Sequence, residues 1–184
     1  SLWIEGHPDD ELKRKWKYYL DEAEQEADVE AQLEKIREEY KTIKPEEIKI
    51  IDPCMGSGHI LVYAFDVLMQ IYETAGYTQR EASRSIVENN LYGLDIDDRA
   101  FQLAYFAVMM KARQYNRRIL NERVTCHIYA IPESNIINPK QLKCFGNDMD
   151  KRKRDDASNQ VSSVLDTFSD AKEFGSLLKV GKYN

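Results

Sequence analysis

The sequence predicts an α/β domain with a parallel sheet, and three observations support that prediction. Short β-branched runs alternate with longer helical stretches in the order β-α-α-β-α-β. The first expected strand runs directly into a Gly-x-Gly turn, and the second ends on an acid. Because parallel strands need crossover connections, which are right-handed in nearly all proteins, this order favours one continuous sheet. Its carboxyl edge is then the expected place for a ligand.

Composition places the chain among ordinary globular proteins. It has 184 residues, of which 42% are hydrophobic and 32% are charged, and this suits one domain with a small appendage. No apolar run approaches the roughly 18 residues of a membrane span, and the N-terminus lacks the apolar core of a signal peptide. We therefore expect a cytoplasmic protein without a membrane partner. The three cysteines form no C-x-x-C pair and the three histidines no metal-ligand spacing, so we expect reduced thiols and no metal site.

The net charge of -6 is spread unevenly along the chain. Residues 1–47 hold 15 acids and 8 bases, a net charge of -7, whereas residues 48–184 hold 17 acids and 18 bases, a net charge of +1. The overall acidity therefore does not exclude a nucleic-acid partner. No strongly basic stretch indicates such a partner by itself.

Residues 1–44 are expected to form a helical N-terminal segment, ahead of a domain over residues 45–184. Apolar residues of this segment recur at helical spacing in two stripes: Leu12, Trp16 and Tyr19 or Leu20, then Val29, Leu33, Ile36 and Tyr40. The acidic run between the stripes is a candidate break, and Pro45 ends the segment. Because the remaining faces are charged, the helices are expected to pack on one side. Apolar surface left uncovered there would promote self-association.

The elements of the domain follow from periodicity and capping signals. We expect strands at residues 48–52, 91–96 and 124–131, and helices at residues 58–74, 78–90 and from Asp97 or Asp98 onward. The first of these helices is apolar almost all round, as in a helix packed beside a sheet. Gly76 is a candidate stop for it, and Thr78 with Glu81 predicts a cap for the next helix. Residues 145–160 are polar without periodicity, which predicts a flexible loop, and a short helix is expected after them.

The stretch DPCMGSG at residues 52–58 is typical of a backbone seat for an anionic group. Glycine adopts positive φ and lets the backbone approach a ligand, while the following helix begins with its partial positive charge at the loop. The acid at the strand end, Asp52, suits a cationic group beside that anion. A carboxylate and an ammonium occur together on the amino-acid arm of S-adenosylmethionine, which we therefore expect as the cofactor. The alternative is a tight strand-to-helix turn without a ligand.

Two other ligand classes fit this loop poorly. The stretch lacks the Gly-Lys-Ser/Thr of loops that bind nucleoside triphosphates. The third glycine of a dinucleotide fingerprint would fall at Leu61, so that pattern also fails. Both observations narrow the choice toward a ligand with an amino-acid arm.

A second acid supports an adenosine-bearing ligand. Asp95 ends the second strand, which lies beside the first in a doubly wound sheet, and an acid there can accept hydrogen bonds from ribose hydroxyls. Such an acid usually follows the loop by roughly 20 residues. Here the crossover holds two helices, which lengthens the spacing. Asp97 and Asp98 have a plainer explanation as cap and first-turn acids of the next helix, and an ordinary surface acid is the alternative for Asp95.

These stretches carry a family resemblance. DPCMGSGHIL, followed by YGLDIDDRAFQLA, resembles the first two cofactor motifs of S-adenosylmethionine-dependent DNA adenine-N6 methyltransferases. The stretches WIEGHPDDELKRKWKYYL before them and HILVYAFDVLMQIYE after the glycines resemble more specifically the PglX-type enzymes of phage-defence (BREX) and restriction-modification systems. The resemblance spans about residues 2–135 and weakens from residue 138 onward.

The resemblance implies a Rossmann-like methyltransferase fold with a partial parallel sheet over residues 45–184. It implies that the loop holds the methionine arm, that Asp95 holds the ribose and that Ile96 packs on the adenine. The end of the third strand also meets the adenine in this family, where Glu133 or Ser134 gives a loose match. The expected cofactor-binding residues are Asp52, Pro53, Cys54, Met55, Gly56, Ser57, Gly58, Asp95, Ile96 and Glu133.

The sequence departs from the family at the catalytic motif. An Asn/Asp-Pro-Pro-aromatic tetrapeptide holds the flipped adenine in these enzymes, and here INPK at residues 137–140 is the only Asn-Pro. We therefore expect no catalytic residues and no methyl transfer by this chain, which would be the cofactor-binding part of a longer enzyme acting on double-stranded DNA. One alternative is a non-catalytic interaction module on a degenerate methyltransferase fold. Another is a nucleotide-dependent oxidoreductase, although the missing third glycine argues against it.

Overall fold

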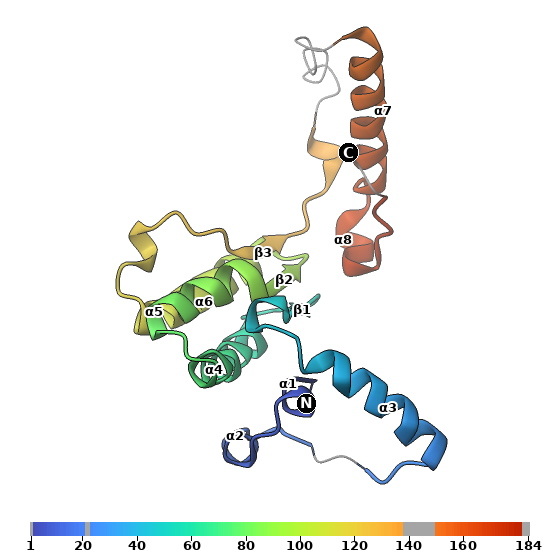
Figure 1. The fold of residues 1–184 in the computed structure, drawn as a ribbon. Coiled ribbons are helices and arrows are strands. Elements are labelled where there is room, and N and C mark those ends of the chain that lie inside the picture. Colours follow the sequence, from blue (N-terminus) through green and yellow to red (C-terminus); the bar gives the residue numbers. More distant parts are fainter. Residues whose placement is uncertain (1, 21–22, 138–149, 182–184) are drawn as a thin grey trace.

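Three short parallel strands form the centre of the molecule. The computed structural model describes residues 2–20, 23–137 and 150–181 (Figure 1). The strands are β1 (Ile50–Asp52), β2 (Leu91–Asp95) and β3 (His127–Ala130). They lie in the order β1-β2-β3 with parallel pairing throughout. The predicted parallel sheet is confirmed, and the carboxyl ends of its strands share one edge.

Helices connect the strands and cover one face of the sheet. These helices are α4 (His59–Thr74), α5 (Gln79–Ser85) and α6 (Asp98–Tyr115). α4 and α6 contact each other and the strands, and they bury Leu91 and Ile128 beneath them. Alternate strand residues point the other way, where Ile51 is 62% and Tyr129 48% exposed. Because parallel sheets are normally covered on both faces, the described residues leave the second face open for further structure.

The predicted helix ends are confirmed. Asp97 caps α6 by accepting the Arg99 N–H at 2.8 Å. Thr78 and Glu81 form a reciprocal capping box at the start of α5. Gly76 follows α4 with φ +87°, a conformation that glycine adopts without strain.

Asn90 fastens the crossover that leads into β2. α5 continues into a π-helical turn, Ile86–Asn90, whose last residue is fully buried. The Asn90 Nδ2 group donates to the carbonyls of Pro45 (2.7 Å) and Ile48 (2.8 Å), and Oδ1 accepts from the Tyr72 hydroxyl (2.9 Å). A buried amide satisfied in this way stabilises a single arrangement. Because the Ile48 carbonyl bonds to a side chain rather than to a strand, β1 begins at Ile50, later than predicted.

The N-terminal segment is helical in three pieces, broken by irregular chain. The pieces are α1 (Leu2–Gly6), α2 (Asp10–Lys15) and α3 (Ala27–Tyr40). Residues 16–20 and 23–26 are not helical, so the candidate break between the two apolar stripes is confirmed, and it begins at Trp16, earlier than the acidic run. α3 buries none of its residues, whereas Trp3 and Trp16 join the hydrophobic cluster that contains α4.

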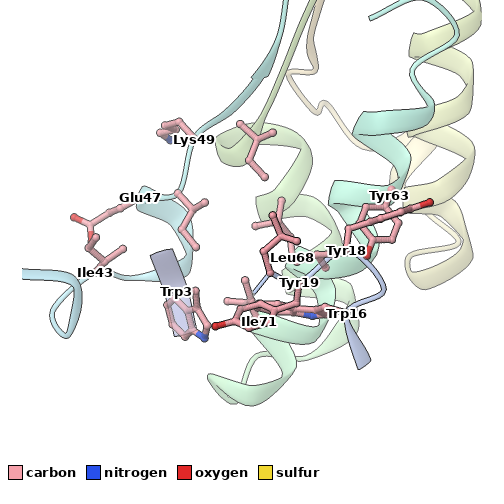
Figure 2. A pocket seen from close by; sticks show the side chains of 14 residues that line it. Trp3, Trp16, Tyr18, Tyr19, Ile43, Glu47, Lys49, Tyr63, Leu68 and Ile71 are labelled. Carbon is pink, nitrogen blue, oxygen red and sulfur yellow. The ribbon is translucent and has the colours of Figure 1, made fainter. Parts of the chain in front are cut away.

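An apolar groove of about 650 Å³ lies between the N-terminal residues, β1 and α4 (Figure 2). Trp16 fixes one wall, because its Nε1–H donates to Gln70 Oε1 at 3.1 Å. Tyr18 packs edge-on against Tyr63 of α4, with ring centroids 5.1 Å apart. The groove is lined by Trp3, Trp16, Tyr18, Tyr19, Leu20, Ile43, Glu47, Ile48, Lys49, Ile50, Tyr63, Val67, Leu68 and Ile71. It lies at the start of β1, away from the glycine loop at the strand's other end.

The C-terminal residues form a helical arm on the opposite side of the sheet from α1–α3 (Figure 1). Its helices are α7 (Lys151–Thr167) and α8 (Ala171–Phe174). The flexible loop expected at residues 145–160 is therefore wrong for residues 151–160, while residues 145–149 lie outside the described part of the chain. The first turns of α7 are charged. Half-buried positions recur at helical spacing in the rest of the helix and at the residue after it: Ala157, Gln160, Val161, Val164, Leu165 and Phe168. Because the apolar stripe occupies only the second half of the helix, its periodicity was not evident over residues 145–160.

No helix in the described residues is long and apolar enough to cross a membrane. Likewise, no group of three or more His, Cys, Asp or Glu side chains in that part of the chain is placed to hold a metal ion.

Candidate functional site

The loop from β1 into α4 turns sharply at two glycines in left-handed conformations. Gly56 has φ +52° and Gly58, which precedes the first residue of α4, has φ +77°. The Gly58 N–H donates to the Met55 carbonyl at 2.8 Å, and the Met55 N–H donates to the Leu94 carbonyl of β2 at 3.1 Å. The loop is therefore bonded both to itself and to the neighbouring strand.

The side chain of Met55 anchors the loop to the hydrophobic core. Its side chain is 2% exposed and lies over Gly93 of β2. A Cβ atom at Gly93 would lie 2.5 Å from the Met55 sulfur and 2.8 Å from Leu61 Cδ1, so only glycine leaves room there. Met55, predicted as a cofactor-binding residue, therefore has its side chain in the core and presents only its backbone to the loop.

The two loop glycines have different surroundings. A Cβ atom at Gly58 would lie 2.8 Å from Ala104 Cβ, so this glycine permits the close approach of α6 to the start of α4. A Cβ atom at Gly56 would meet nothing within 4 Å. Gly56 therefore borders space that the described residues leave open, while Gly58 serves helix packing as well as the turn.

Asp52 is a buried carboxylate with one unsatisfied oxygen. The residue is 8% exposed at the end of β1, and its Oδ1 accepts the Cys54 N–H at 3.2 Å. Its Oδ2 atom is buried and has no hydrogen-bond partner among the described residues. Leaving a buried anionic oxygen without a donor costs free energy. This position therefore suits a hydrogen-bond donor with positive charge.

Asp95 bridges the loop and the end of β2. Its Oδ2 accepts the Gly56 N–H at 2.8 Å, and its Oδ1 accepts the Asp97 N–H at 3.0 Å. A carboxylate offers about four lone-pair sites, so two acceptor positions are left for other donors. The two predicted acids thus both accept backbone N–H groups of the same loop, Asp52 from Cys54 and Asp95 from Gly56.

The start of α4 adds positive potential to the loop. The helix has 16 residues and no acid in its first turn. The N–H groups of that first turn have no partner within the helix, and they point back along its axis toward residues 56–58. The backbone of this turn can therefore receive an anionic group beside Asp52.

The remaining predicted residues lie around this centre. Pro53, Cys54 and Ser57 are exposed on the loop. Ile96, directly after β2, is 45% exposed. Glu133 lies three residues beyond the end of β3 and is half-buried, and no hydrogen bond among the described residues joins it to the loop. One residue was missed from the sequence: Gly175, after α8, is buried against Ile96, and no local pattern links positions so far apart.

A parallel sheet with a glycine loop at its carboxyl edge and acids ending its first two strands is typical of Rossmann-like domains that bind adenosine-containing cofactors. Residues 21–142 match the family model described as MmeI, DNA-methyltransferase domain. This match covers more than half of the chain. The chain belongs to this family of DNA-methyltransferase domains.

Curated relatives agree with that family. The chain is 46% identical over 164 residues to the adenine-specific methyltransferase PglX of Lacticaseibacillus casei (strain Zhang), covering 89% of this chain and 13% of the relative. It is 41% identical over an alignment of 194 residues to the adenine-specific methyltransferase BrxX of Escherichia coli O9:H4 (strain HS), covering 97% and 16%. A putative type II restriction enzyme and methyltransferase of Methanocaldococcus jannaschii is 43% identical over 65 residues, covering 32% and 6%. The chain thus spans less than a fifth of the length of each relative.

Proposed function

We propose that this chain is the cofactor-binding part of an S-adenosylmethionine-dependent DNA adenine-N6 methyltransferase of the phage-defence or restriction-modification type. The observation that carries the proposal is the buried Oδ2 of Asp52, which has no hydrogen-bond partner among residues 2–20, 23–137 and 150–181, beside a glycine loop at a helix N-terminus. An ammonium beside this oxygen and a carboxylate at the N–H groups of the first turn of α4 would satisfy the acid and the helix end, and an amino-acid arm supplies the two groups together. The names of the relatives support the same chemistry.

Each predicted residue then has a distinct part in the proposal. Asp52 accepts hydrogen bonds from the ammonium, and the N–H groups of the first turn of α4 receive the carboxylate, while Gly56 and Gly58 shape the turn beside it. Asp95 accepts from the ribose hydroxyls with its two remaining positions, while Ile96 packs on one adenine face and Glu133 lies at the adenine edge. The cofactor, when bound, supplies a methyl group on a positively charged sulfur. The residues of this chain hold and orient that group, and such positioning accounts for much of the rate in group transfer.

The acceptor half of the reaction is proposed for the longer protein. Its expected substrate is adenine in double-stranded DNA, turned out of the helix to reach the cofactor. The stretch INPK, which lacks the second proline and the aromatic residue, lies mostly outside the described residues. We therefore expect this 184-residue chain to bind the cofactor and to transfer no methyl group to DNA.

Calorimetry with S-adenosylmethionine and with NAD tests the proposal. Binding of the former alone supports it, and binding of NAD alone would assign the chain to nucleotide-dependent oxidoreductases. Binding of neither would favour a non-catalytic interaction module, which the absent catalytic tetrapeptide also favours. Transfer of labelled methyl groups to DNA by this chain would contradict the assignment of a cofactor-binding part alone.

A further inference from the structure

The C-terminal arm reaches back to the end of β2. Ala171, the first residue of α8, is fully buried, and Gly175 is buried where the 3-10 turn Gly175–Leu177 begins. That turn contacts β2, and Lys172 Nζ lies 3.7 Å from Asp98 Oδ2. A segment about 80 residues further along the chain is thus seated beside the strand end that carries Asp95.

Gly175 permits this close seating for two separate reasons. Its backbone has φ +54° and ψ −128°, which other residues adopt only with strain. A Cβ atom added there would lie 3.1 Å from Ile96 Cγ2. A side chain at this position would therefore force either Ile96 or the segment to shift by a few tenths of an ångström, besides straining the backbone.

The arm is also fixed at the end of β3. The Ser134 N–H donates to the Phe168 carbonyl at 2.9 Å, and the Ser134 hydroxyl donates to the Leu165 carbonyl. Ser134 directly follows Glu133. The arm therefore spans from the residue after Glu133 to Ile96, along the stretch of sheet edge where the adenosine is proposed to lie.

The segment borders this stretch and does not fill it. With the segment in place, Ile96 keeps 45% of its surface exposed and Glu133 is only half-buried. Resting on the proposed function, we propose that residues 171–177 form the outer wall of the adenosine side of the cofactor site, with Gly175 setting how closely that wall approaches Ile96. The wall contributes to holding adenosine and makes no contact with the amino-acid arm.

The test compares Gly175→Val with a matched control, Gly76→Ala. Gly76 also has positive φ, but a Cβ atom there meets nothing within 4 Å and the residue follows α4, away from the site. Each variant of the 184-residue chain is titrated with S-adenosylmethionine and with 5′-methylthioadenosine, which has the adenosine but lacks the amino-acid arm. We expect Gly175→Val to weaken both ligands by about tenfold and Gly76→Ala to leave both affinities unchanged.

A second variant keeps the test valid where Gly175→Val fails to fold. Lys172→Glu replaces attraction to Asp98 with repulsion at an exposed position, and we expect it to weaken both ligands by about twofold. If Gly175→Val folds and its affinity for both ligands is unchanged, the proposed wall is refuted. If only Lys172→Glu folds, unchanged affinity in that variant refutes it. Tighter binding overturns it too, because the segment would then occupy the adenosine's place. A wild-type chain that binds neither ligand refutes the proposed function itself, and the wall with it.

Discussion

The ends of β1 and β2 carry the same residue type with different bonding. Asp52 is buried and has one oxygen with no partner in the part of the chain that the structure describes, whereas both oxygens of Asp95 accept backbone N–H groups, from Gly56 and Asp97. Asp95 therefore shapes the site before any ligand arrives, because its bond to Gly56 holds the loop of β1. Asp52 contributes little to the fold and is suited to a ligand. Two acids that look equivalent in sequence thus differ in the structure: Asp95 shapes the loop, and we propose that Asp52 receives the ligand.

The largest expected effect tests the receiving role of Asp52. In Asp52→Asn the side-chain oxygen can still accept the Cys54 N–H, which places an amide NH₂ where Oδ2 was. An NH₂ group repels an ammonium, so the affinity for S-adenosylmethionine should fall about 1,000-fold, as for one partner of a buried charge pair. The free energy of unfolding without ligand should be unchanged or higher, because a buried unpaired charge is removed. Calorimetry measures the affinity and thermal unfolding measures the stability. A lower stability with normal affinity would show that Asp52 supports the fold and does not receive the ligand.

The next effect separates the two glycines of the β1 loop. Gly58→Ala places a methyl group 2.8 Å from Ala104 Cβ in a left-handed conformation, and should lower the free energy of unfolding by about 3 kcal/mol. Gly56→Ala meets no neighbour and should cost only about 1 kcal/mol through its conformation. Urea unfolding gives both values. Equal losses of stability would show that α6 does not constrain Gly58.

Asp95→Asn tests the shaping role. Only one oxygen is left for two backbone N–H groups, so the free energy of unfolding should fall by about 1.5 kcal/mol, as for the loss of a charge-assisted hydrogen bond. The affinity for S-adenosylmethionine should fall about tenfold, less than in Asp52→Asn. Hydrogen exchange at the Gly56 amide reports directly on the bond. Undiminished protection of that amide would remove Asp95 from the shaping role.

The smallest effect concerns Ile51, which precedes Asp52 but lies on the open face of the sheet. The chain is predicted to self-associate through its uncovered apolar surface, and Ile51 is 62% exposed. Ile51→Lys should shift sedimentation profiles toward monomer while changing the affinity for S-adenosylmethionine by no more than about twofold. A wild-type chain that sediments as a monomer at every concentration would dismiss the predicted association.

Local signals in the sequence were sufficient for much of the fold. The long apolar run of the helix after Gly58, the cap at Thr78 and the turn at Gly76 each depend on neighbouring residues, and all three are confirmed. A helix was expected after residue 160, and the first part of α7 was missed because the apolar stripe occupies only the second half of the helix. The beginning of β1 was misplaced because the side chain of Asn90, some 40 residues away, takes the Ile48 carbonyl.

By itself the sequence determined the succession of strands and helices along the chain, the left-handed glycine turn and the presence of an acid at the end of each of the first two strands. These features follow from side-chain period and backbone conformation, which act over a few residues. Only the tertiary structure decided which acid is satisfied, which glycine faces open space and that Gly175 lies on Ile96. Those outcomes depend on contacts between residues distant in the chain, and such contacts exist only once the sheet and its helices have packed.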